Sequence, residues 1–254
     1  MISTSNLTKK YAATTAVNAL NLEICRGEIF GFLGPNGAGK TTTIRMLAGV
    51  LRPTSGTIHI GQWNMSIHPR EAKQIIGFIP DRPFLYAKLT GKEFLYFMSK
   101  LYGLNPKHAD KRISFLLDFF EIAYCAGELI ESYSHGMKQR LVMCAALLHQ
   151  PRVLIVDEPM VGLDPKGAKL VKRVFRELAQ KGTTVFMSTH SLEVAEEMCD
   201  RIGIINEGSL IAVGTMTELR ATTGGTAEKL EAIFFKLTGE EVLSEMAVTS
   251  NIRS

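Results

Sequence analysis

The 254-residue sequence predicts an α/β fold with a mixed or parallel central sheet. An apolar strand pattern at residues 28–33 runs into a glycine-rich loop, and a helical pattern follows at residues 40–51. Continuous apolar runs at residues 153–156 and 184–188 flank a helical stretch at residues 165–180. Fully apolar strands between helices are typical of a parallel sheet that is covered on both faces.

The N-terminal part of the chain predicts an additional β layer. Short strand patterns occur at residues 3–7, 20–24 and 57–60, and another follows at residues 75–79. Because strands this close in sequence usually pair with their neighbours, we expect an antiparallel β subdomain beside the first strand–loop–helix unit.

The middle of the chain predicts a helical subdomain, inserted at about residues 84–145. Residues 84–133 hold 11 of the 20 aromatic residues, on segments with helical spacing. Thr90 and Glu93 fit a capping box, and Asn105 before Pro106 fits the start of a second helix. Most of these aromatic side chains are expected in a core, and an exposed minority is expected to form a docking surface.

The C-terminal part predicts a hairpin, a joint and one short helix. Strand patterns at residues 202–205 and 210–213 flank a turn at residues 206–209. Residues 221–226 are expected to form a flexible joint, and an amphipathic helix is expected around residues 230–237.

Composition and charge exclude several classes of protein. The 46% hydrophobic content excludes disorder, and the net charge of +4 is too small for a dedicated nucleic-acid binder. The longest apolar runs, such as residues 141–148, are too short to span a bilayer, and no secretory signal is expected. The four separated cysteines (Cys25, Cys125, Cys144 and Cys199) are expected as reduced, buried thiols of a cytosolic protein.

The glycine-rich loop predicts a phosphate-binding site. The loop residues are Gly34, Pro35, Asn36, Gly37, Ala38, Gly39, Lys40 and Thr41, followed by Thr42, and they satisfy the pattern G-x4-G-K-[ST]. Backbone N–H groups of such a loop and of the following helix surround phosphate oxygens. We expect Lys40 to place its charge on the β- and γ-phosphates and the Thr41 hydroxyl to reach Mg²⁺.

A second motif places two carboxylates at the end of a buried strand. Asp157 and Glu158 directly follow the apolar run at residues 153–156. We expect Asp157 to hold Mg²⁺ and Glu158 to orient and deprotonate an attacking water.

The segment before that strand resembles the signature sequence of the ATP-binding-cassette (ABC) family. Residues 133–140 read Tyr-Ser-His-Gly-Met-Lys-Gln-Arg. Tyr11 matches the aromatic A-loop, residues 161–164 match the D-loop, and His190 matches the switch histidine. Together with the glycine-rich loop and the Asp157-Glu158 pair, these make six motifs in the family's order. They extend the resemblance over about residues 2–215. The signature segment, the sequence Gly-Leu-Asp-Pro and the C-terminal helix look most like ATP-binding proteins of ABC-2-type exporters.

The resemblance implies a domain organisation and further binding residues. It implies a P-loop NTPase fold with an ABC-type nucleotide-binding domain at residues 2–215, followed by a short extension at residues 216–254. Tyr11 would stack on adenine, and Val17 would touch the ribose side of the same pocket. In a head-to-tail dimer, Ser134, Gly136 and Asp164 would complete the nucleotide site. His190 would contact the γ-phosphate and hold Glu158 and the water in line.

Two positions depart from the family pattern. Asp81 stands where the family normally has a glutamine that touches Mg²⁺; its carboxylate would keep an oxygen ligand for the ion, with an added charge and one methylene fewer. His135 replaces a glycine of the signature; facing the nucleotide, it would add a donor and restrict the backbone.

The function that the resemblance implies is ATP hydrolysis coupled to transport. The chain would bind ATP and Mg²⁺, form a homodimer, and drive a separate integral-membrane permease from the cytoplasmic face of the membrane, without binding nucleic acid. One alternative is a soluble cassette ATPase without a membrane partner, as in iron–sulfur assembly. A nucleic-acid-handling cassette is disfavoured because such proteins usually carry paired cassettes or long coiled coils. Kinases and GTPases lack the signature and the Asp-Glu pair.

Overall fold

The central element of the structure is a six-stranded sheet with the strand order β10-β9-β3-β8-β7-β6. The computed structural model describes residues 1–82, 84–222 and 229–239. The strands are β3 (Ile29–Leu33), β6 (Ile76–Ile79), β7 (Val153–Asp157), β8 (Thr184–Ser188), β9 (Arg201–Asn206) and β10 (Ser209–Gly214). Every neighbouring pair is parallel except β9 and β10, which form the predicted antiparallel hairpin. The predicted mixed sheet is therefore confirmed.

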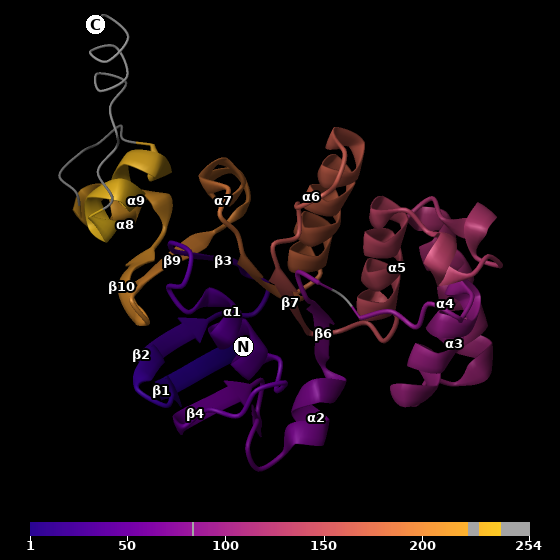
Figure 1. The fold of residues 1–254 in the computed structure, drawn as a ribbon, viewed down its shortest axis with the longest axis horizontal. Helices are drawn as coiled ribbons and strands as arrows, with labels where there is room; N and C mark the ends of the chain where they lie inside the picture. Colours follow the sequence, from indigo (N-terminus) through magenta and orange to yellow (C-terminus); the bar gives the residue numbers. More distant parts are fainter. Residues whose placement is uncertain (83, 223–228, 240–254) are drawn as a thin grey trace, which may run out of the picture.

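A smaller sheet with the order β2-β1-β4-β5 forms the N-terminal layer (Figure 1). Its strands are β1 (Ile2–Tyr11), β2 (Thr14–Ile24), β4 (Ser55–Ile60) and β5 (Trp63–Asn64), and all pairs are antiparallel. The strands β1 and β2 are longer than the predicted patterns at residues 3–7 and 20–24. Register shifts along the β1–β2 pair interrupt the alternation of buried and exposed side chains, so the sequence pattern revealed only part of each strand.

Helices cover both faces of the six-stranded sheet (Figure 1). They include α1 (Lys40–Leu47), α2 (Pro69–Gln74), α6 (Pro165–Gln180) and α7 (Leu192–Met198). On strand β7, Val153 and Ile155 pack into the cluster that contains α1 and the small sheet. Leu154 and Val156 pack into the opposite cluster, which contains α6 and α5 (His135–Leu147). Burial on both faces explains why this strand is apolar without interruption.

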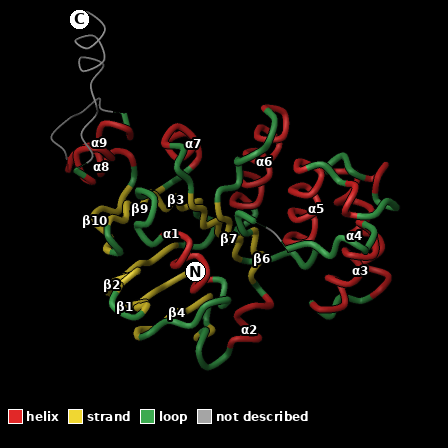
Figure 2. The backbone as a smooth tube through the Cα atoms, viewed as in Figure 1, coloured by secondary structure: helices red, strands yellow, loops and turns green. Residues whose placement is uncertain are grey.

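Three helices form a separate group at one end of the molecule (Figure 2). They are α3 (Gly91–Leu101), α4 (Pro106–Phe119) and α5 (His135–Leu147), with two short 3₁₀ turns between α4 and α5 (Ala123–Cys125 and Ile130–Ser132). The predicted capping box of Thr90 and Glu93 begins α3, and Asn105 caps α4. Both predicted helix starts are confirmed.

Several predicted elements differ from the structure. The first helix ends at Leu47 rather than at residue 51, because Gly49 adopts a left-handed φ of 68°. The short helices α2, α7 and α8 (Met216–Thr222) were not predicted. Residues 221 and 222 of the expected joint belong to α8, and residues 223–226 lie outside the described part. The predicted C-terminal helix is α9 (Leu230–Thr238). Of the four cysteines expected to be buried, Cys25 is exposed and Cys199 is half-buried.

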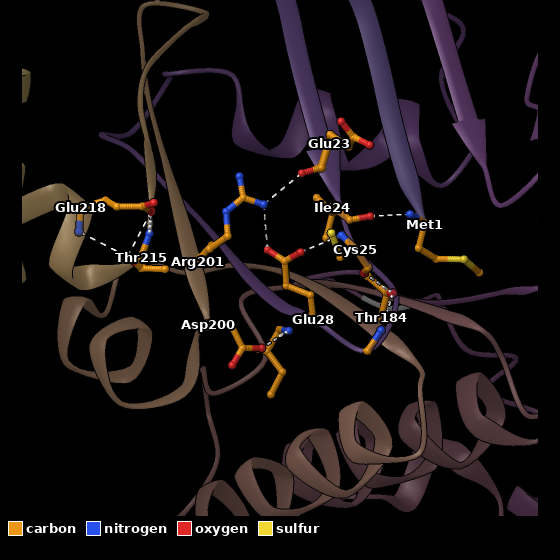
Figure 3. A network of polar contacts seen from close by, with 12 residues as sticks. Met1, Glu23, Ile24, Cys25, Glu28, Thr184, Asp200, Arg201, Thr215 and Glu218 are labelled. Carbon is orange, nitrogen blue, oxygen red and sulfur yellow. Dashed lines mark hydrogen bonds and ion pairs between the residues drawn. The ribbon is translucent and has the colours of Figure 1, made fainter.

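A polar network joins the small sheet to the central sheet (Figure 3). The buried Glu28 carboxylate accepts hydrogen bonds from the backbone N–H of Cys25 at 2.6 Å and from Arg201 at 3.1 Å. Arg201 also donates to the carbonyl oxygen of Glu23 at 3.2 Å. Next to this pair, the Asp200 carboxylate accepts from the backbone N–H of Ile29 at 2.8 Å. These bonds fix the end of β2 against β9 at the point where the chain enters β3.

His149 is expected to make the fold acid-sensitive. Its ring stacks on Tyr102 with centroids 3.7 Å apart, and its Nε2 lies 3.0 Å from the Ile76 carbonyl oxygen. Burial lowers the pKa of His149 to about 4, from about 6.5 in an unfolded chain. The folded state therefore favours neutral His149. Its contribution to stability is complete above pH about 6.5 and is lost as the pH falls to about 4, by at most about 3 kcal/mol.

Chemical denaturation at pH 7 and pH 5 measures this loss. We expect His149→Gln to lose part of the difference between the two pH values, and His108→Gln on the exposed surface of α4 to keep it. An identical pH dependence in the wild type and in His149→Gln would contradict the assignment.

Candidate nucleotide-binding site

A cavity of about 440 Å³ lies at the carboxyl ends of the central strands, over the glycine-rich loop. Ten of its lining residues were predicted site residues: Asn36, Gly37, Gly39, Lys40, Thr41, Thr42, Asp81, Asp157, Glu158 and His190. Four of them, Asp81, Asp157, Glu158 and His190, lie forty residues or more beyond the loop in the sequence. The parallel strands bring these segments together, because their carboxyl ends meet at one edge of the sheet.

Glycine is required at two positions of the loop by close backbone approach. A Cβ atom on Gly39 would lie 2.3 Å from the Ala16 carbonyl oxygen, and the residue has a left-handed φ of 106°. A Cβ atom on Gly34 would lie 2.3 Å from the Ile205 carbonyl oxygen. No side chain in the described structure caps the first turn of α1. Its N–H groups and the positive end of the helix dipole therefore suit an anionic ligand.

Lys40 extends across the loop at the first position of α1. Its Nζ donates hydrogen bonds to the carbonyl oxygens of Gly34 at 2.5 Å and of Pro35 at 2.9 Å. Burial lowers the pKa of Lys40, and the nearby carboxylates of Glu158 and Asp157 act in the opposite direction. The Lys40 ammonium group is thus partly desolvated and lies near two carboxylates. A phosphate group bound beside it would form a strong charge-assisted hydrogen bond with this ammonium.

The two carboxylates have different partners. Asp157 is buried at the end of β7 and accepts a hydrogen bond from the Ser188 hydroxyl at 2.5 Å. Glu158 adopts a left-handed φ of 53°, and its Oε2 lies 2.9 Å from Nδ1 of His190. The backbone N–H of His190 donates to the same oxygen at 3.3 Å. Glu158 is therefore held by the segment after β8, with its side chain on the cavity wall.

The oxygen donors at the cavity suit a hard divalent cation. Thr41 offers a hydroxyl, and Asp157 and Asp81 offer carboxylates; Mg²⁺ prefers oxygen ligands and is commonly shared with substrate phosphates. Within residues 1–82, 84–222 and 229–239, no group of three or more His, Cys, Asp or Glu side chains is arranged to hold a metal alone. A magnesium site here would need phosphate oxygens to complete its coordination.

The structure places the three residues predicted from the signature and the D-loop away from this cavity. Ser134 precedes α5, and its hydroxyl accepts from the backbone N–H of Met137 at 3.3 Å. Gly136 lies in the first turn of the same helix, with open space where a side chain would be. Asp164 caps α6 by accepting from the backbone N–H of Gly167 at 3.0 Å. Both helix starts are exposed, and neither contributes to the lining of the cavity beside Lys40.

The predicted contacts to the base and ribose remain predictions. Tyr11 lies at the end of β1, with 47% of its surface exposed and Lys9 Nζ 5.2 Å from its ring centroid. Val17 is fully buried in the core, and its neighbour Ala16 lines the cavity instead. Three loop residues also lie outside the lining: Gly34, Pro35 and Ala38. Ala38 packs in the core, whereas Gly34 and Pro35 border a neighbouring cavity that His190 also lines.

Sequence reasoning did not assign three residues to the site, although Val161 belongs to the predicted D-loop match. Ala16 and Val161 line the cavity, and Ser188 binds Asp157. Ser188 ends β8 opposite Asp157 in the strand register, so its position two residues before His190 was the available signal. Ala16 carried no such signal, because β2 reaches the loop only in the folded chain.

The fold and the cavity together define a P-loop nucleoside triphosphatase. A family model described as "ABC transporter" matches residues 17–161, more than half of the chain. The chain belongs to the ABC transporter family, and it is an ATP-binding, ATP-hydrolysing subunit of that family. Within the described residues, no helix is both long and apolar enough to cross a membrane.

Several similar proteins are named for resistance or for transport. The chain is 41% identical to the linearmycin resistance ATP-binding protein LnrL of Bacillus subtilis over 89% of this chain and 72% of that protein. It is 43% identical to the bacitracin transport ATP-binding protein BcrA of Bacillus licheniformis, over 83% and 68% of the two chains. It is 38% identical to the daunorubicin/doxorubicin resistance ATP-binding protein DrrA of Streptomyces peucetius, over 90% of this chain and 69% of that protein.

Solved structures show the same fold. An ATP-binding subunit of an ABC transporter is 31% identical and superimposes with a TM-score of 0.89, covering 94% of this chain and 99% of that one. The cassette MJ0796, solved as a dimer bound to ADP and Pi, is 25% identical with a TM-score of 0.78, over 85% and 99% of the two chains. The predicted family and fold class are therefore confirmed.

Proposed function

We propose that the chain is the ATPase subunit of an exporter and that it hydrolyses ATP in a head-to-tail dimer. The observation that carries this proposal is the separation of the signature from the cavity. Lys40, Asp157 and Glu158 line the cavity, whereas Ser134 stands exposed at the start of another helix. A second copy that presents its own Ser134 would complete each site. The dimeric cassette MJ0796 supports this arrangement, as do the resistance and transport names of the relatives.

Each cavity residue has a role in this proposal. The loop N–H groups and Lys40 bind the phosphates, and Thr41 with Asp157 holds Mg²⁺. Asp81 lies on the cavity wall, and we propose that its carboxylate reaches the ion through water. Bound Mg²⁺ would neutralise charge that develops on the phosphates. Glu158 accepts the proton of the attacking water, and His190 orients Glu158.

The remaining predicted contacts are part of the same proposal. Tyr11 stacks on adenine, and Val17 supports the ribose side of the pocket from behind Ala16. From the second copy, Ser134 and Gly136 bind the γ-phosphate at the start of α5, where the helix dipole favours negative charge. Asp164 of that copy approaches the same site. The ABC-type domain would occupy residues 2–215, with about 84–145 as its helical subdomain and 216–254 as the extension.

We also propose that an integral-membrane permease docks on the helical group. A cavity of about 480 Å³ beside α4 has Leu104, Phe115 and Leu148 among its lining residues. Phe97 and Leu101 of α3 are 39% and 64% exposed. An amphipathic helix of a permease would bury these apolar side chains. Such docking would hold the chain at the cytoplasmic face of the membrane, and co-purification of a polytopic membrane protein with the chain tests it.

Mixed dimers test whether the nucleotide is shared between two copies. Ser134→Arg removes a usable signature, and Lys40→Ala removes tight ATP binding, so each homodimer is expected to be inactive. In a mixed dimer both lesions fall on one site, and the other site keeps an intact loop and an intact signature. Mixing the two variants should therefore recover up to about half of the wild-type hydrolysis, because one of the two sites is restored.

Differential tags verify that mixed dimers form. ATP hydrolysis is measured on the doubly purified species, with each single variant as the matched control. Verified mixed dimers that stay as inactive as both parents would contradict the shared site.

A further inference from the structure

His135 contacts the loop that follows the two carboxylates. It is the first residue of α5 and is exposed. A Cβ atom placed on Gly162 would lie 2.5 Å from both Cδ2 and Nε2 of the imidazole. The ring therefore lies directly against the Gly162 backbone, which has a left-handed φ of 74°. The imidazole fills the space that any side chain at position 162 would need.

The loop that His135 contacts comprises residues 158–164. The first residues of this loop lie at the nucleotide cavity. Glu158 and Val161 line that cavity, and Glu158 is held by His190. At its end, Asp164 caps α6. Between these two ends the backbone makes two short turns, closed by long hydrogen bonds of 3.3 Å (Val161 N–H to Glu158) and 3.4 Å (Leu163 N–H to Met160). Such turns are weakly constrained by themselves, so an external contact has a large effect on their position.

His135 also lines a second cavity, of about 390 Å³. Asp81 lines both this cavity and the nucleotide cavity. Charged side chains of Arg82, Glu131 and Lys138 also line the second cavity. His135 thus contacts the 158–164 loop and shares a cavity with the segment that carries Asp81.

We propose that His135 is a positioning residue for ATP hydrolysis, holding the 158–164 loop so that Glu158 and Val161 stay at the nucleotide cavity. The contact is made by ring packing against Gly162 rather than by a hydrogen bond to the nucleotide. The inference rests on the proposed catalytic role of Glu158. It assigns a function to a residue that replaces glycine in the signature segment.

Three substitutions of His135 separate packing from hydrogen bonding. His135→Ala removes the ring, His135→Phe keeps a flat ring without a donor, and His135→Gln keeps a donor without a ring. We expect His135→Ala to lower kcat about five-fold with the KM for ATP changed less than about two-fold, since an indirect effect acts on the reacting geometry rather than on binding. His135→Phe should restore most of the loss, and His135→Gln should not. Rescue by glutamine but not by phenylalanine would overturn the packing role.

Hydrogen exchange supplies a readout that does not depend on activity. Amides of residues 160–164 should exchange about ten-fold faster in His135→Ala, because loss of the contact frees the loop. Amides of β7 should be unchanged, as an internal control. Because His135 is exposed, its substitution leaves the core intact. Unchanged exchange in the loop would overturn the proposal.

A second variant tests the contact from its other side. Gly162→Ala forces the new Cβ against the imidazole and also strains the left-handed backbone. Only the first effect disappears when His135 is alanine. The kcat penalty of Gly162→Ala should therefore be several-fold smaller in the His135→Ala background. An equal penalty in both backgrounds would overturn the proposal, whereas failure of the role of Glu158 would appear separately as normal turnover of Glu158→Gln.

Discussion

Glu158→Gln is expected to bind MgATP with near-normal affinity and to hydrolyse it at least about 10²-fold more slowly. The amide has the shape of the carboxylate but cannot accept the proton of the attacking water. Glutamine also keeps a side-chain oxygen for the bonds that Glu158 makes with His190. The variant should therefore retain ATP binding while losing hydrolysis, and it should accumulate a dimer that holds ATP between its subunits.

Single-turnover hydrolysis and size-exclusion chromatography with MgATP measure these two properties. Glu177→Gln on the exposed surface of α6 is the matched control, and it should retain wild-type kinetics. Near-normal turnover in Glu158→Gln would remove Glu158 from the role of general base.

Lys40→Ala is expected to lose ATP affinity and hydrolysis together. A charge-assisted hydrogen bond to phosphate contributes about 1.5–3 kcal/mol, so affinity should fall about 10- to 100-fold. Activity should fall with it, because Lys40 would contact the phosphates in both the ground and the transition state. Truncation also leaves the carbonyl oxygens of Gly34 and Pro35 without the ammonium that they now accept from.

Equilibrium binding of a fluorescent ATP analogue measures this loss. Circular dichroism confirms folding, and Lys107→Ala on the exposed start of α4 is the control for loss of one positive charge. Unchanged nucleotide affinity in folded Lys40→Ala would contradict the assignment of the glycine-rich loop.

Features that depend on neighbouring residues were predictable from the sequence. The capping box of Thr90 and Glu93 and the Asn105 cap form within a single turn, so their residue types were sufficient evidence. The glycine-rich loop was equally local, since strand, loop and helix follow one another. Helix ends set by backbone geometry were less predictable. The left-handed Gly49 ends α1 within an apolar pattern that continues to residue 51.

Contacts between segments that are far apart in the sequence could not be predicted from local sequence patterns. The family resemblance implied that Val17 touches the ribose side of the nucleotide pocket. Only the packing of β2 against α1 buries it and leaves Ala16 at the cavity. Likewise, the sequence showed that His135 departs from the family pattern, but its contact with Gly162 follows from the positions of α5 and the 158–164 loop.

The sequence by itself determined the class of chemistry, because phosphate binding and water activation need particular residue types at fixed local spacing. The tertiary structure decided which of these residues share a site. Parallel register places Asp157 opposite Ser188, next to the segment that carries His190, and so joins two motifs that are thirty residues apart. The same fold keeps Ser134 at the start of α5, outside the cavity of Lys40. The physical reason is that strand pairing and helix packing act between segments whose distance in sequence carries no information about their distance in space.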